Sequence, residues 1–143
     1  MTVAAILEGR KGVPAITVPL GMKVRDVVAL LSERKIGAVP VMDGEKVAGI
    51  MSERDVIHCL AHDGADMLDW PVEKIMTAPA ITVDPSMTAL GALSLMTSRR
   101  IRHLPVIADG QLVSVVSIGD LVKHRLGQIE AEAQAMLSYI QTA

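Results

Sequence analysis

The hydrophobic positions of the chain follow one pattern that occurs twice. A short apolar run, AITV, ends at turn residues at 15–18 and again at 80–83. Each run precedes a stretch whose apolar residues recur at helical spacing, and two further apolar runs around a polar turn come next, at 38–51 and 104–116. This order predicts a strand, a helix, a hairpin and a second helix in each half of the chain.

The helical stretches differ in how clearly they begin. Ser86 is a candidate cap for the second one, and Ser52 and Ser117 are placed to open the helices that follow the hairpins. A last amphipathic helix is predicted over 127–143. The apolar positions of the three periodic stretches are Val24, Val27, Val28, Leu30 and Leu31, then Met87, Leu90, Leu93, Leu95 and Met96, and finally Ile129, Ala133, Met136, Leu137 and Ile140.

The two halves are related by a constant offset of 65 residues, which indicates an internal duplication. The matched pairs are Ile16/Ile81, Thr17/Thr82, Val18/Val83, Met22/Met87, Ile36/Ile101, Pro40/Pro105, Val41/Val106, Ser52/Ser117 and Asp55/Asp120. Upstream, Val3 and Val72 each begin a Val-x-x-Ile pattern, and the first copy continues through a longer connection that carries Arg10 and Lys11. We therefore divide the chain into repeat 1 at 1–62, a linker at 63–71, repeat 2 at 72–126 and the terminal helix.

Composition narrows the classes of function. The length of 143 residues suits one domain or two closely packed halves, and charges interrupt every apolar run before the roughly 18 residues of a membrane span. The start lacks a signal-peptide pattern and Cys59 is the single cysteine, so we expect a cytoplasmic protein without disulfides or membrane contact. A net charge of −2, with one Trp and one Tyr, argues against a nucleic-acid polymer as partner.

The duplicated strand, helix, hairpin and helix, with a proline in each second strand and Ser-x-x-Asp after each third strand, resembles the tandem CBS-domain module, named for cystathionine β-synthase. The resemblance covers about residues 3–126. Within the family, the chain is most similar to the small stand-alone bacterial CBS-pair proteins of signal transduction. It implies an α/β fold of two β-α-β-β-α repeats about a pseudo-twofold axis. It also implies two clefts for adenine ligands such as AMP, ADP, ATP, NAD or S-adenosylmethionine, association as a flat homodimer, and no fused catalytic domain.

The Ser-x-x-Asp pairs have two readings. A serine at a helix start beside free backbone N–H groups suits phosphate oxygens, and an ionised aspartate accepts hydrogen bonds from ribose hydroxyls. The pairs Ser52/Asp55 and Ser117/Asp120 fit these roles. The same spacing is also that of a capping box, which a duplicated helix would duplicate. Both readings hold together if a cap rearranges around a ligand.

The resemblance places the remaining cleft residues at the ends of the first and second strands. Because the family combines the Asp of one repeat with the strand ends of the other, Ser117 and Asp120 belong with the first set below, and Ser52 and Asp55 with the second. The sets are Thr17, Val18, Gly37, Ala38 and Pro40, and then Thr82, Val83, Arg102, His103 and Pro105, with Arg54 a further basic candidate. The basic residues of the second set favour a di- or triphosphate there, or else form an exposed basic edge. Gly49 stands where the second repeat has Ser114, so the cleft floors need not match.

Other chemistry has weaker support. His58 and His62 lie one helical turn apart with Cys59 and Asp63 nearby, which offers a divalent metal only a partial ligand set, and solvated histidines are the alternative. No activating base accompanies the Ser and Asp pairs, so we expect no enzyme and no catalytic cofactor. The predicted function is an adenine-nucleotide sensor that regulates an unidentified target. The alternative is an interaction module with vestigial clefts that acts through dimer and terminal-helix contacts.

Overall fold

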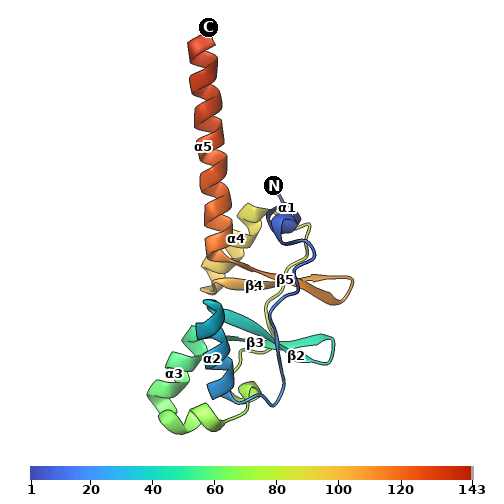
Figure 1. Cartoon of the computed structure of the whole chain (residues 1–143), viewed down its shortest axis with the longest axis vertical. Coiled ribbons are helices and arrows are strands. Elements are labelled where there is room, and N and C mark those ends of the chain that lie inside the picture. Colours follow the sequence, from blue (N-terminus) through green and yellow to red (C-terminus); the bar gives the residue numbers. More distant parts are fainter. Residues whose placement is uncertain (143) are drawn as a thin grey trace.

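The computed structural model describes residues 1–142, and it divides into two similar halves with one long helix that projects from the second (Figure 1). The first half contains β1 (Val18–Pro19), α2 (Val24–Arg34), β2 (Ala38–Asp43), β3 (Lys46–Ser52) and α3 (Glu53–Asp63). The second contains α4 (Ala89–Arg99), β4 (His103–Ala108), β5 (Gln111–Ser117) and α5 (Ile118–Thr142). Short helical turns connect them: α1 (Val3–Leu7), η1 (Glu8–Arg10), η2 (Ala65–Asp69) and η3 (Val72–Lys74). The predicted α/β class is confirmed.

The hairpins show the duplication in their hydrogen-bond register. In β2–β3, Ala38 pairs with Ser52, and in β4–β5, His103 pairs with Ser117. The register shifts at the same place in the first strand of each hairpin, after Val41 in β2 and after Val106 in β4. The same irregularity at the same offset means that both repeats bend their hairpins in the same way.

The predicted first strands are much shorter in the structure. Only Val18–Pro19 forms a strand in the first half, parallel to β2, and the second half keeps a single bridge between Val83 and Val106. The reason is local: Pro19 lacks an N–H, and Asp84-Pro85 turns the second run away, so neither ladder continues.

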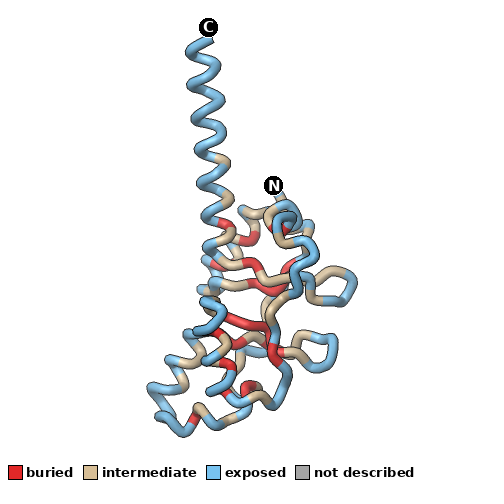
Figure 2. Tube along the Cα trace, in the orientation of Figure 1, coloured by how far each residue is buried: buried red, intermediate tan, exposed pale blue. Residues whose placement is uncertain are grey.

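The segments that precede the two repeats cross over to the opposite half. The backbone N–H of Val3 donates to the carbonyl of Met87 at 2.8 Å, and that of Val72 donates to the carbonyl of Met22, also at 2.8 Å. Val3 is therefore buried in the core of the second half, with Val106 among its neighbours, and Val72 in the core of the first. The two cores form separate buried layers (Figure 2). Each core therefore includes a segment that precedes the other repeat in the sequence.

Two helix ends differ from the sequence interpretation. Thr88 caps α4, because its hydroxyl accepts from the Gly91 N–H at 2.9 Å, whereas the N–H of Ser86 donates to Asp84 in the preceding turn. The last helix does not begin at Gly127 but runs unbroken from Ile118, since a single glycine costs a helix only about 1 kcal/mol.

Candidate functional site

Two cavities lie between the halves, and residues of both halves line each one. Cleft I contains Asp120 and has a volume of about 480 Å³, and cleft II contains Asp55 and has a volume of about 420 Å³. Both volumes are in the range of small-molecule sites. Cleft I is lined by Arg10, Val13, Pro14, Ala15, Ile16, Lys35, Ile36, Gly37, Ala38, His103, Ser114, Val115, Ser117 and Asp120. Cleft II is lined by Gly37, Ala38, Ile50, Ser52, Glu53, Arg54, Asp55, Ile57, Thr77, Ile81, Arg100, Ile101, Arg102 and His103.

The crossed pairing of the predicted residues is present in this geometry. Ser117 and Asp120 of the second half face Gly37 and Ala38 of the first, while Ser52, Arg54 and Asp55 face Arg102 and His103. Three residues, Gly37, Ala38 and His103, line both clefts, so the strand starts of β2 and β4 separate them. A Cβ on Gly37 would stand only 3.0 Å from Cε1 of His103, so the absence of a side chain there leaves room for the imidazole.

Six predicted residues lie outside both clefts. Thr17 and Thr82 are exposed, Val18 and Val83 belong to the two cores, and Pro40 and Pro105 are buried within the hairpins. Neighbouring residues of an extended segment point to opposite sides, so Ile16 and Ile81 line the clefts where the threonines were expected. Ile36 and Ile101 were also missed as cleft residues. Each of these isoleucine pairs has the 65-residue offset, which was the available signal.

The Ser-x-x-Asp pairs are capping boxes that also face the clefts. In cleft II the Ser52 N–H donates to Asp55 Oδ2 at 2.8 Å, and the Asp55 N–H donates back to Ser52 Oγ at 3.3 Å. The matching distances at Ser117 and Asp120 are 2.8 and 3.1 Å. Each cap uses Oδ2, which leaves the other carboxylate oxygen free to contact a different partner. Capping and ligand contact are therefore compatible in one carboxylate.

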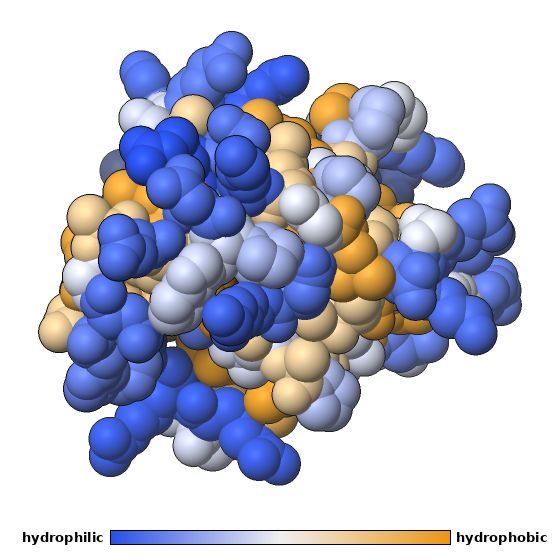
Figure 3. Space-filling model, turned by 90° about the horizontal axis from the view of Figure 1, so that it is seen from below, coloured by the Kyte–Doolittle hydropathy of each residue, from blue (hydrophilic) through white to orange (hydrophobic). Residues whose placement is uncertain are grey.

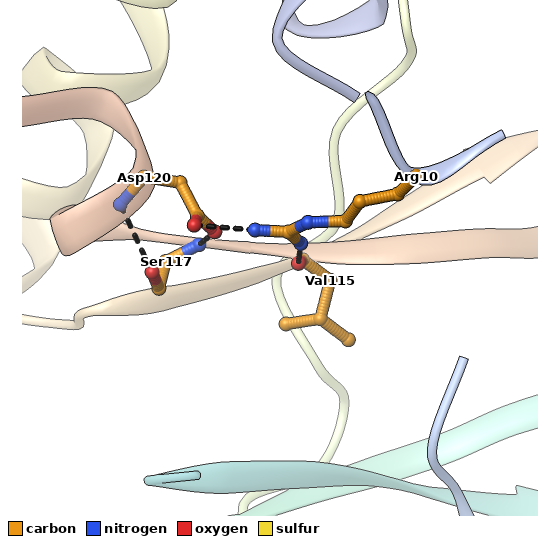
Figure 4. Close-up of polar contacts among 4 residues, drawn as sticks. All are labelled: Arg10, Val115, Ser117 and Asp120. Atoms are coloured by element: carbon orange, nitrogen blue, oxygen red, sulfur yellow. Dashed lines mark hydrogen bonds and ion pairs between the residues drawn. The ribbon is translucent and has the colours of Figure 1, made fainter. Parts of the chain in front are cut away.

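In cleft I that partner is Arg10, which sequence reasoning noted but did not assign to a site. One Arg10 guanidinium nitrogen pairs with Asp120 Oδ1 and another donates to the Val115 carbonyl at 2.9 Å (Figure 4). Burial alone would raise the pKa of Asp120, but hydrogen bonds from Ser117 and Arg10 and the guanidinium charge more than offset it and lower the pKa. Asp120 is thus ionised, and both of its carboxylate oxygens already have partners, Arg10 and the Ser117 N–H.

In cleft II the partner of the carboxylate is neutral. Thr77 Oγ1 donates to Asp55 Oδ1 at 3.0 Å, and the Thr77 backbone exchanges two hydrogen bonds with Ile50, at 2.9 and 3.0 Å. This close approach depends on Gly49, because a Cβ there would lie 2.7 Å from the Thr77 carbonyl oxygen. The difference between Gly49 and Ser114 therefore has a structural cause.

Cationic residues line both clefts. The C-caps of α2 and α4, Lys35 and Arg100, share a left-handed conformation with φ of 55° and line clefts I and II respectively. Arg54 lies across cleft II and donates to the Arg100 carbonyl at 2.7 Å. Burial lowers the pKa of His103, Arg102 lowers it further, and Glu53 and Asp120 partly oppose this. Cleft II therefore combines three arginines with a partly buried histidine whose pKa is lowered.

The histidines of α3 form a pair and not a ligand set. The rings of His58 and His62 meet edge to face with centroids 4.5 Å apart, and the Cys59 thiol donates to Asp63 at 3.4 Å. Burial and Asp63 raise the pKa of Cys59, which disfavours a thiolate. Among residues 1–142, no three or more His, Cys, Asp or Glu side chains are grouped closely enough to hold a metal ion. Within the same residues, no helix has the length and apolar character needed to cross a membrane.

Known proteins with similar sequences and folds place these features in context. The family model of the CBS domain matches residues 10–62 and 72–127. The mitochondrial CBS domain-containing protein CBSX3 of Arabidopsis thaliana is 39% identical over 123 residues, which cover 82% of this chain and 60% of the relative. This chain thus spans less than two thirds of that relative.

Two solved structures extend the comparison to the fold. A protein with CBS domains from Burkholderia ambifaria is 40% identical, with a TM-score of 0.84 over 89% of this chain and 95% of that one. CBSX2, solved in complex with AMP, is 28% identical, with a TM-score of 0.74 over 90% of this chain and 98% of that one. Both cover nearly the full length of the compared protein.

Proposed function

The chain belongs to the CBS domain family, and from this premise we propose that it is a regulatory module that binds an adenine nucleotide between its two halves and has no catalytic activity. The observation that carries the proposal is the composition of the clefts. Each combines a Ser-x-x-Asp carboxylate from one half with isoleucines and strand ends from the other. A ligand there touches both halves at once, so its binding energy can favour one relative arrangement over another.

The chemistry of each cleft matches the parts of a nucleotide. A carboxylate oxygen that faces the cavity suits two ribose hydroxyls, the isoleucine side chains offer an apolar slot for the base, and arginines suit phosphates. CBSX2, whose structure contains AMP, shows that a related fold accepts such a ligand. AMP, ADP, ATP and NAD are therefore the ligands to test first.

We assign the primary site to cleft II. The Asp55 oxygen that the helix cap does not use, Oδ1, is held there by the Thr77 hydroxyl, which a ribose hydroxyl can replace at little cost. Arg54, Arg100 and Arg102 supply positive charge for a di- or triphosphate. In cleft I a ligand must first displace the Arg10 guanidinium from Asp120. Breaking a charged pair costs more than exchanging one hydroxyl for another.

Thermal unfolding with each nucleotide tests the proposal. A ligand present at about 100 times its dissociation constant adds roughly 2.7 kcal/mol of stability. We expect AMP, ADP, ATP or NAD to raise the midpoint of the wild type and of Asp120→Asn, and to leave Asp55→Asn unchanged. The two variants are matched, because both retain a side chain that can cap its helix. If no adenine ligand raises the wild-type midpoint, the proposed function is wrong.

A further inference from the structure

Helix α5 projects far beyond the cores that hold the rest of the chain. Its first turns pack on the second half, where Leu121 is fully buried, but residues beyond Gln128 are all exposed (Figures 1 and 2). Isolated helical segments shorter than about 12–15 residues are only marginally stable in water, and helices in proteins gain most of their stability by burying one face. The outer part of α5 has no such contact within residues 1–142.

The exposed apolar residues of α5 form one stripe with heptad spacing. The stripe consists of Val122, Leu126, Ile129, Ala133, Met136 and Ile140, at alternating intervals of four and three residues. Exposure of its large side chains ranges from 45% at Val122 to 61% at Met136 and Ile140. Alternating intervals of four and three are the signature of a helix that packs lengthwise against another helix. Seen from the opposite end of the molecule, hydrophobic residues are instead interspersed with hydrophilic ones (Figure 3).

The charges beside the stripe indicate which helix fits. Lys123 and Arg125 flank its inner part, and Glu130 and Glu132 flank its outer part. If a second α5 runs antiparallel, with Leu126 opposite Ile129 of the second copy, each lysine and arginine lies opposite a glutamate, four oppositely charged pairs in total. A parallel pair in register matches only Arg125 with Glu130. Opposite charges at the flanking positions set partner and orientation in coiled coils.

We propose that the α5 stripe is a docking surface for the α5 helix of a second copy of this chain, packed antiparallel. The interface is isologous and closes as a dimer, because at this register Val122, Leu126, Ile129 and Ala133 of each stripe cover the same four residues of the other. The partner is a second copy because the basic and acidic parts of one α5 complement those of another. This dimer differs from the flat arrangement of CBS pairs expected from the family resemblance, and it does not depend on nucleotide binding.

Cysteine cross-linking in a Cys59→Ser background tests both the contact and its direction. Antiparallel packing brings Val122 of one copy opposite Ala133 of the other, so a mixture of Val122→Cys and Ala133→Cys chains should form a disulfide-linked heterodimer. Ala133→Cys alone should not cross-link, because its two copies lie about 16 Å apart along the axis at a rise of about 1.5 Å per residue, too far for a disulfide. Efficient cross-linking of Ala133→Cys alone, with no Val122–Ala133 heterodimer in the mixture, would show parallel packing and overturn the proposal.

Sedimentation gives the second test. At micromolar concentration the wild type should be at least a dimer, and Ile129→Glu should have half its sedimenting mass, whether or not the CBS pairs also associate in the flat arrangement. Leu90→Glu is the matched control, since Leu90 is 74% exposed but lies on α4, away from the stripe. Both variants change an exposed residue and should leave the cores intact, and circular dichroism would check that each variant is folded. A monomeric wild type, or an Ile129→Glu variant that dimerises as the wild type does, would contradict the proposed surface.

Discussion

The two clefts are built from equivalent positions of the two repeats and differ in the residue that contacts the hairpin and the carboxylate. Val115 in cleft I and Ile50 in cleft II are equivalent positions of the duplicated hairpin. The carbonyl of Val115 receives the side chain of Arg10, whereas Ile50 is paired with the backbone of Thr77. The same carboxylate is consequently bound by a cation in one cleft and by a hydroxyl in the other. Duplication thus fixed the positions of the two sites, and the segments leading into each repeat made them different.

The largest expected difference between the clefts concerns their floors. Gly49→Ala places a Cβ against the Thr77 backbone and Met76, and overpacking of this kind costs about 1–3 kcal/mol. The equivalent change in the other half, Ser114→Ala, should stay within about 0.5 kcal/mol. Urea unfolding of both variants measures the contrast. Equal losses of unfolding free energy in the two variants would show that the close approach of the Thr77 backbone does not distinguish Gly49 from Ser114.

A second, smaller expected effect is a pH dependence of the free energy of unfolding that comes from Asp120 in cleft I. Because the folded pKa of Asp120 is lowered, its ionisation stabilises the fold above its unfolded pKa of about 3.9, and this contribution is lost as the pH falls through the folded value. The free energy of unfolding of Asp120→Asn should therefore be below that of the wild type at neutral pH, and the gap should close as the pH falls below about 4. A gap that is constant with pH would show that the carboxylate charge contributes nothing.

The smallest expected effect involves His103, which lines both clefts. Its pKa is lowered mainly by burial, so a phosphate placed nearby should raise it and favour proton uptake on binding. Calorimetry in buffers of different ionisation heat should detect less than one proton taken up per nucleotide near pH 6.5, the ordinary pKa of histidine. His103→Gln should abolish the uptake. Uptake that persists in this variant would assign the proton to another group.

The sequence predicted the fold well because duplication repeats its signals. Offset-related residues such as Ser52 and Ser117 mark the helix starts in both halves, and the hairpins follow from alternating apolar runs around polar turns. The crossing of Val3 and Val72 into opposite cores could not be predicted, since both segments have the same pattern and either core would accept them.

The candidate site could be predicted in part. The carboxylates were found because two helices repeat them. Thr17 and Thr82 were placed one residue away from the cleft-lining isoleucines, because a strand of two residues is too short for its inward face to be read from alternation. Arg10 was not assigned, since its contact with Asp120 spans 110 positions of the chain and depends on the crossing of the N-terminal segment.

The number of nucleotides bound per chain tests the inequivalence of the clefts most directly. Isothermal titration with ATP should give one site in the wild type and in the control Lys11→Gln, whose side chain lines neither cleft. Arg10→Gln should give two sites, because it frees Asp120. Two sites of equal affinity in the wild type, or one site that persists in Asp55→Asn, would contradict the assignment of cleft II as the primary site.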